Sequence, residues 1–196
     1  IGGSLGDVYG ERRVFTIGVA GFGVASLLCA AAPTIEVLIG ARAVQGVFGA
    51  LLTPSALAVI VGAFPPRERG GAIGSWTAWA GIATVIGPFA GGWLVETASW
   101  RWIFAVNVPF VVVTIALVAI AVPPPERDRA PRSVDWAGAV LCAVGLAGPV
   151  YALIRQPAVG WAPEVLAPLL GGVAVFAAFL LREARTPDPM LPLGLF

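Results

Sequence analysis

The sequence predicts an all-α protein, a polytopic bundle of transmembrane helices, and three observations support this class. First, the 196 residues include only 12 lysine plus arginine and 11 aspartate plus glutamate, whereas 58% are hydrophobic and the mean hydropathy is +0.90. An average soluble domain is nearer a quarter charged. Second, the charged residues are separated by six long apolar runs. Third, the arginines favour every second connection between these runs.

The six runs contain 17 to 30 residues each, and only one of them includes a charge. A helix needs about 20 apolar residues to cross a hydrocarbon core about 30 Å thick, whereas a membrane strand needs about 10 of alternating polarity. The alternative is a soluble protein with six buried helices. Six consecutive apolar runs of this length disfavour it. The runs lie between Arg13 and Glu36, Glu36 and Arg67, Arg69 and Glu96, Arg101 and Glu126, Asp135 and Arg155, and Glu164 and Arg182.

The arginines predict the orientation. The stretches around residues 7–13, 64–70, 123–133 and 182–196 carry nine of them, while the alternate connections carry only two, at positions 101 and 155. The positive-inside rule therefore places the first set of stretches in the cytoplasm. Tryptophans at the ends of the runs are typical of an interfacial aromatic belt.

Composition also excludes several classes. The formal net charge of +1 and the lack of a basic stripe argue against a nucleic-acid partner. There is no histidine, and Cys29 and Cys142 are far apart, so we expect no metal site, cofactor or enzymatic activity. Gly21-Phe22-Gly23 starts like a dinucleotide fingerprint, but it lacks the third glycine and the strand–turn–helix context.

The first motif is a short loop before the first complete run. It contains two bounding glycines, one acid and a basic pair, and the acid can cap backbone N–H groups or pair with an arginine. Composition alone favours an ordinary capped turn with positive-inside arginines. The residues are Gly3, Asp7, Gly10, Arg12 and Arg13.

The second motif surrounds Arg42, which lies six residues past Glu36, or about 9 Å along a helix. Gln45, Gly46 and Gly49 follow at helical spacings and share its face. A charge at this depth is costly and usually faces a bundle interior or an aqueous cavity. The alternative is that Arg42 extends to the outer interface. The polar and small-residue face favours a functional position.

The third motif lies late in the following run, with Pro88 expected to kink the helix. Gly87 and Gly91 form a GxxxG pair that permits close approach of another helix, and Gly92 extends the small stripe. An ordinary packing interface explains these residues as well as a hinge or a tight seal does.

Together the three motifs resemble those of the major facilitator superfamily, in the drug:proton antiporter branch with fourteen spans. The resemblance implies that the loop of Asp7 gates the cytoplasmic side, that Arg42, Gln45 and Gly46 serve proton coupling, and that Gly87, Pro88, Gly91 and Gly92 form the antiporter motif of exporters. The segment Trp100 to Phe104, with Asn107 and Pro109, also looks like this branch. The departures from the family pattern are Val8, Glu11, Phe48 and Ala83.

The resemblance further implies a domain layout. Residues 1–122 would belong to the N-terminal transmembrane bundle, from the end of span 2 to span 6, and residues 123–133 to a cytoplasmic loop. Residues 134–182 would form two additional transmembrane helices, and residues 183–196 a loop toward a missing C-terminal bundle of the same chain. We interpret the sequence, which begins with Ile1, as a fragment from the middle of a longer protein.

The function implied is multidrug or metabolite efflux in the cell inner (plasma) membrane, by proton-coupled antiport with alternating access. Its partners would be the lipid bilayer, protons and a small hydrophobic or cationic substrate. All 11 carboxylates lie in loops or at run ends, so we expect the coupling acid outside this chain, with Arg42 tuning its pKa. Transport of a native metabolite or lipid, and a non-transporting scaffold or sensor, are the alternatives.

Overall fold

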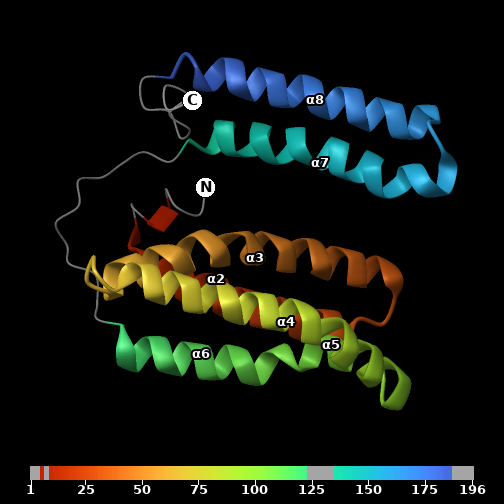
Figure 1. Ribbon diagram of the computed structural model, residues 1–196. Coiled ribbons are helices and arrows are strands. Elements are labelled where there is room, and N and C mark those ends of the chain that lie inside the picture. Colours follow the sequence, from red (N-terminus) through yellow and green to blue (C-terminus); the bar gives the residue numbers. More distant parts are fainter. Residues whose placement is uncertain (1–4, 7–8, 123–134, 187–196) are drawn as a thin grey trace. The chain divides into compact units, whose positions relative to one another are not determined.

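The computed structural model describes residues 5–6, 9–122 and 135–186, and the regular structure in these ranges is helical (Figure 1). Within them, six segments are long and apolar enough to cross a membrane, judged by length and composition. This number and the all-α class confirm the prediction from the apolar runs. The helices are α2 (Glu11–Ala31), α3 (Ile35–Ala63), α4 (Arg69–Thr97), α5 (Trp102–Ala105), α6 (Asn107–Ala121), α7 (Trp136–Val159) and α8 (Pro163–Glu183).

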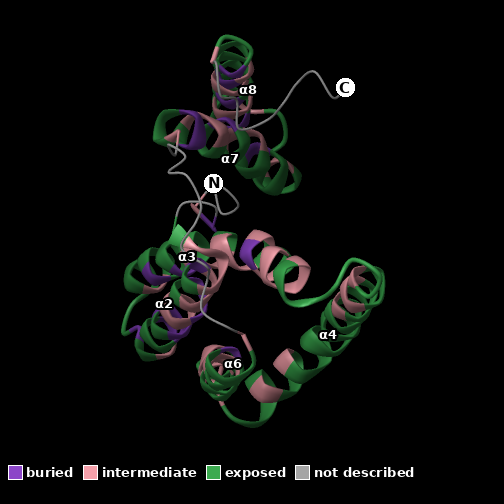
Figure 2. Ribbon diagram, turned by 90° about the vertical axis from the view of Figure 1, so that its left-hand side faces the viewer, coloured by how far each residue is buried: buried purple, intermediate pink, exposed green. Residues whose placement is uncertain are grey.

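The chain divides into two compact units, one within residues 2–132 and the other within residues 133–196. In the first unit, α2 packs against α3, α5 and α6, and its buried residues form a continuous stripe (Figure 2). Glycines on α2 allow the close approach. A Cβ added at Gly21 would lie 2.2 Å from the ring of Phe48, and one at Gly23 would lie 2.7 Å from Val111. These two glycines therefore serve helix packing.

The fourth apolar run forms two helices rather than one. The short α5 ends at Ala105, and α6 begins at Asn107. Pro109 explains the break, because it has no N–H to donate to the carbonyl of Ala105 and its ring crowds that carbonyl. The break places the side chain of Asn107 at the first turn of α6, next to α2.

Arginines connect both ends of α2 to neighbouring elements, Arg12 to α6 and Arg101 to the start of α5. At one end, Arg12 Nη2 donates to the carbonyl of Ala119, in the last turn of α6, at 3.2 Å. At the other end, Arg101 Nη2 donates to the carbonyl of Ala32, which caps α2, at 3.1 Å. Each arginine satisfies a carbonyl near a helix C-terminus, where the helix dipole favours positive charge.

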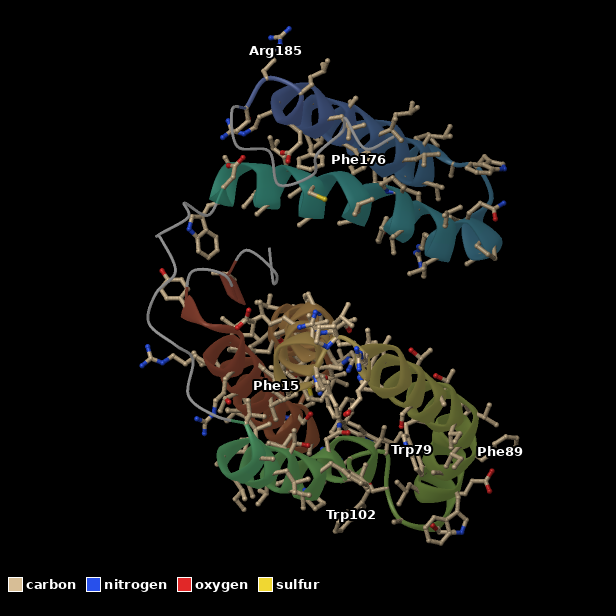
Figure 3. All side chains as sticks on the ribbon, turned by 60° about the vertical axis from the view of Figure 1, so that its left-hand side comes forward. Phe15, Trp79, Phe89, Trp102, Phe176 and Arg185 are labelled. Atoms are coloured by element: carbon tan, nitrogen blue, oxygen red, sulfur yellow. The ribbon has the colours of Figure 1, made fainter. Side chains whose placement is uncertain are left out.

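The helix α4 has an open surface within the described residues. None of its residues is buried, and its contacts within the described residues are mainly with α3 and α5. Trp79 and Phe89, labelled in Figure 3, project from α4 and are 68% and 78% exposed. Such a surface suits lipid tails or another transmembrane helix.

In the second unit α7 and α8 form a tightly packed hairpin. A Cβ at Gly148 would lie 2.3 Å from the carbonyl oxygen of Pro168, so the two backbones nearly touch. Asp135 caps α7 by accepting from the N–H of Gly138 at 2.9 Å, and it pairs with Arg182 at 3.0 Å. The guanidinium of Arg182, and then the N–H of Gly138, hold the pKa of Asp135 below its ordinary value.

Candidate functional site

A buried polar cluster joins α2 and α3 close to the short turn that connects them. Ser26 and Cys29 lie six and three residues before Ala32, and Arg42 and Gln45 lie eight and eleven residues after Thr34. Gln45 is 1% exposed, and Ser26 and Cys29 are fully buried. These are the only buried polar side chains that the described part of the two helices contributes, apart from one serine further along α3.

Gln45 is the centre of this cluster. Its Oε1 accepts from Arg42 Nη1 at 2.6 Å, and its Nε2 donates to Ser26 Oγ at 2.5 Å. The thiol of Cys29 lies 3.8 Å from the same Oε1, which is a weak hydrogen bond. The amide therefore uses both of its ends, and the predicted neighbours Arg42 and Gln45 are in direct contact.

Ser26 connects the cluster to α6. Besides the amide of Gln45, its Oγ accepts from Asn107 Nδ2 at 3.3 Å. A hydroxyl oxygen has two lone pairs, so these two donors occupy its full accepting capacity. The cluster thus extends over three helices.

The guanidinium of Arg42 lies at the open edge of the cluster. Its Cζ is 5.7 Å from the ring centroid of Phe104, on α5, within the range of a cation–π contact. The residue as a whole is exposed, and among the described residues Gln45 is the one acceptor of its N–H groups. A guanidinium has five N–H donors, so others besides the one bound to Gln45 can meet a further acceptor.

The chemistry available to this cluster is limited by its residue types. It contains a fixed cation, two amides, a hydroxyl and a thiol, but no carboxylate. Arginine stays protonated in proteins, so the cluster can orient a positive charge and cannot itself load and release a proton at neutral pH. Among the described residues, no group of three His, Cys, Asp or Glu side chains could hold a metal ion.

The other residues of the second motif lie elsewhere on α3. Gly46 is exposed, and nothing among the described residues lies within 4 Å of a Cβ added there. A Cβ added at Gly49 would lie 3.8 Å from the ring of Phe22. Phe48, which departs from the family pattern, fits because Gly21 leaves space for its ring. The bulk of Phe48 is thus matched by a glycine on α2.

The gating motif is described only in part. Gly3 and Asp7 lie outside the described residues, as does the loop 123–133. Gly10 precedes α2 with a φ of 88°, a conformation that favours glycine. Arg12 lies against the end of α6, and Arg13 is exposed.

The antiporter motif lies on the open surface of α4. Pro88 is inside this helix and leaves the carbonyl of Thr84 without its usual donor. Nothing among the described residues lies within 4 Å of a Cβ added at Gly87, Gly91 or Gly92. The close helix approach that the GxxxG spacing predicts therefore requires a partner outside these residues, and it stays a prediction.

A hollow of about 230 Å³ lies between α2, α3 and α6, beside Asn107. Aromatic and aliphatic side chains line most of it, including Phe15, which Figure 3 labels on α2. Pockets for drug-sized ligands measure about 300–1,000 Å³. The hollow is too small to be such a site by itself.

Comparisons with known proteins identify the family. The sequence profile described as Major Facilitator Superfamily matches residues 1–192. The chain is 38% identical over 195 residues to the tetracenomycin C resistance and export protein of Streptomyces glaucescens, covering 99% of this chain and 36% of that protein. It is 44% identical over 198 residues to the puromycin resistance protein pur8 of Streptomyces alboniger, covering 99% and 39%.

A further relative is the multidrug resistance protein Stp of Mycobacterium tuberculosis, which is 40% identical over 195 residues, covering 98% of this chain and 36% of the relative. The chain therefore spans about a third of the length of these relatives, all of which are named for resistance and the first also for export. The family match supports the expectation that the chain is not an enzyme. By its sequence profile, and by the six membrane-length segments within the described residues, the chain belongs to the major facilitator superfamily and is a partial multi-pass bundle of that fold.

Proposed function

We propose that the complete protein exports hydrophobic, often cationic compounds from the cytoplasm by proton-coupled antiport with alternating access. The family and the names of three relatives support export of drug-like compounds. Because those relatives are bacterial, the proposal places the protein in the plasma membrane. The substrates to test first are puromycin and tetracenomycin C, which appear in the relatives' names.

The observation that carries the coupling part of the proposal is the placement of Arg42. Its guanidinium is bound by Gln45 within a membrane-length helix, and it has further N–H donors that a carboxylate can accept from. A cation within about 4–6 Å of a carboxyl group lowers the pKa of that group. Arg42 then tunes a coupling carboxylate that a segment outside the described residues supplies.

The test is transport by the complete protein in proteoliposomes, with Arg42→Ala, Arg42→Lys and the control Arg155→Ala. Arg155 is an exposed arginine on α7, which belongs to the other compact unit. We expect Arg42→Ala to raise the pKa of the coupling group and to move the pH profile of efflux to higher pH, with a smaller shift for Arg42→Lys. Normal proton-coupled efflux in Arg42→Ala would refute the assignment.

The gating role of the first motif is a separate part of the proposal. The hydrogen bond from Arg12 to α6 supports it, because this bond ties the basic end of the loop to the bundle. Asp7 is assigned to hold the inner side closed through the arginines of the loop. Wild-type efflux in Asp7→Asn, with unchanged cysteine accessibility from both sides of the membrane, would exclude this role.

The antiporter motif is assigned to a tight seal against a helix outside the described residues. The open small-residue surface around Pro88 on α4 supports this assignment, because such a surface can accept a close neighbour. Proton leak through liposomes that contain Pro88→Ala decides the point. An unchanged leak and unchanged coupling would leave the motif a plain packing surface.

A further inference from the structure

We infer that Ser26 and Asn107 are positioning residues for Arg42. Together with Gln45 they form a relay of hydrogen bonds that runs from the start of α6, through α2, to the guanidinium on α3. We define the relay as these four residues. The inference rests on the proposed role of Arg42 in proton coupling, and it assigns to two further side chains the task of orienting that charge.

The polarity of the hydrogen bonds fixes the direction of the Gln45 amide. The guanidinium of Arg42 offers only donors, so it must meet the carbonyl end of Gln45. The NH₂ end then points to α2, where Ser26 supplies an acceptor. Turning the amide around would set donor against donor at Arg42, so the guanidinium selects the orientation of the amide, and the acceptor on Ser26 anchors its other end.

Because both side chains are buried, the hydrogen bond by which Ser26 anchors Gln45 is costly to lose. Ser26 is fully buried and Gln45 is 1% exposed, so water is not at hand to replace a lost partner. Removing one partner of a buried hydrogen bond leaves the other with its full desolvation penalty. If Ser26 lost its hydroxyl, two N–H donors, from Gln45 and Asn107, would be left without their acceptor.

Two residues next to the break between α5 and α6 interact with Arg42, one directly and the other through the relay. Phe104, on α5, lies under the guanidinium, with its ring centroid 5.7 Å away. Asn107, at the start of α6, acts on it through Ser26 and Gln45. Because Pro109 fixes the break between the two helices, the cation–π contact and the relay share one rigid support.

This arrangement predicts how a change in the relay alters transport. Without the hydroxyl of Ser26, the NH₂ end of the Gln45 amide loses its anchor on α2, and the guanidinium is held less closely to its place. A cation that is displaced from the coupling carboxylate lowers the pKa of that carboxylate less. The pH profile of efflux should therefore move toward higher pH, in the same direction as for Arg42→Ala.

The experiment compares Ser26→Ala and Asn107→Ala in the complete protein with a matched control, Ser55→Ala. Ser55 is also fully buried, but its hydroxyl donates to the carbonyls of Leu51 and Leu52 in its own helix. Ser55→Ala removes the same hydroxyl group as Ser26→Ala does, but it leaves no donor on another helix without its acceptor. Efflux is measured against pH in proteoliposomes, together with the amount of folded protein.

We expect Ser26→Ala to shift the pH midpoint by at least half of the shift that Arg42→Ala causes, and Ser55→Ala to leave it unchanged. Ser26→Thr, which keeps a hydroxyl, should restore the wild-type profile. Asn107→Ala should shift the midpoint by less than Ser26→Ala, and it decides the matter if Ser26→Ala does not fold.

The outcomes separate the relay from the proposed function. If Arg42→Ala shifts the profile while folded Ser26→Ala and Asn107→Ala keep the wild-type profile, the relay is refuted and the role of Arg42 stands. If Arg42→Ala itself leaves the profile unchanged, the coupling role fails and the relay fails with it. An equal shift in Ser55→Ala would show that any buried hydroxyl has this effect, and would also overturn the relay.

Discussion

Gly172→Ala should separate α7 from α8, and the adjacent Gly171→Ala should not. A Cβ at Gly172 would lie 2.4 Å from Pro149 Cδ, 2.9 Å from Gly148 Cα and 3.0 Å from the carbonyl oxygen of Gly145. Nothing among the described residues lies within 4 Å of a Cβ at Gly171. Both glycines are inside α8, so the two substitutions change the helix propensity by the same amount.

The magnitude follows from the contacts of Gly172. Carbon atoms that touch without strain are about 3.5–4.0 Å apart, so the new Cβ and the proline ring must separate by about 1 Å. The atoms that oppose it are backbone atoms and a proline ring, which cannot turn aside as a flexible side chain could. Overpacking of this kind costs about 1–3 kcal/mol, whereas glycine to alanine gains up to about 1 kcal/mol in an exposed helix.

The difference between the two variants isolates the steric cost, because the propensity gain cancels. Gly172→Ala should be less stable than Gly171→Ala by about 1–3 kcal/mol. Unfolding of the complete protein in detergent, followed by tryptophan fluorescence, measures this, since Trp136 and Trp161 lie at the two ends of α7. Equal stability of the two variants would refute the argument that backbone contact at Gly172 sets the spacing of the hairpin.

Two further predictions concern charges at helix ends. Arg101→Leu should lower the stability by about 0.5–1 kcal/mol, because the carbonyl of Ala32 loses its cationic donor, and thermal unfolding equal to that of the wild type would contradict this. The lowered pKa of Asp135 means that its pairing with Arg182 stabilises the hairpin fully above the ordinary value of 3.8 and less as the pH falls below it. Unfolding followed against pH should therefore show acid destabilisation that Asp135→Asn lacks, and identical pH dependence of the two proteins would contradict the assignment.

The fold was predictable from sequence because charges are too costly to place within a bilayer core, so the intervals between them mark the spans. The break between α5 and α6 was not predicted from these intervals. The interval between two charged residues gives the length of an apolar segment. It does not show that Pro109, inside that segment, has no N–H to donate.

The candidate site was predictable only within one helix. Arg42 and Gln45 are three residues apart, so helical periodicity alone makes them neighbours, as their hydrogen bond shows. Ser26 and Asn107 are one hydroxyl and one amide within long apolar runs, and their importance depends on which helices meet. The burial of Ser26 and its two donors became visible only when α2, α3 and α6 were placed together.

Glycine spacing has the same limit. Gly87 and Gly91 on α4 have the GxxxG spacing but no neighbour within 4 Å among the described residues. Gly145 and Gly148 on α7 lack that spacing, yet they lie against the backbone of α8. A small-residue pattern therefore indicates that another helix can approach closely, while the shape of the opposing helix decides whether it does.

Polar contacts along α2 suggest why the proposed relay can hold Arg42 firmly. Ser26 lies fourteen residues after Arg12 and six before Ala32, which are about 21 Å and 9 Å along the helix. The hydrogen bond of Arg12 holds the last turn of α6 against α2, the bond of Arg101 holds the start of α5 against the other end of α2, and the bond from Asn107 lies between them. Because these bonds hold the segment from α5 to α6 against α2 on both sides of Asn107, they oppose a displacement of Asn107 when Gln45 moves. The antiparallel pair of α2 and α6 thus serves as the fixed reference against which the relay sets the position of the guanidinium on α3.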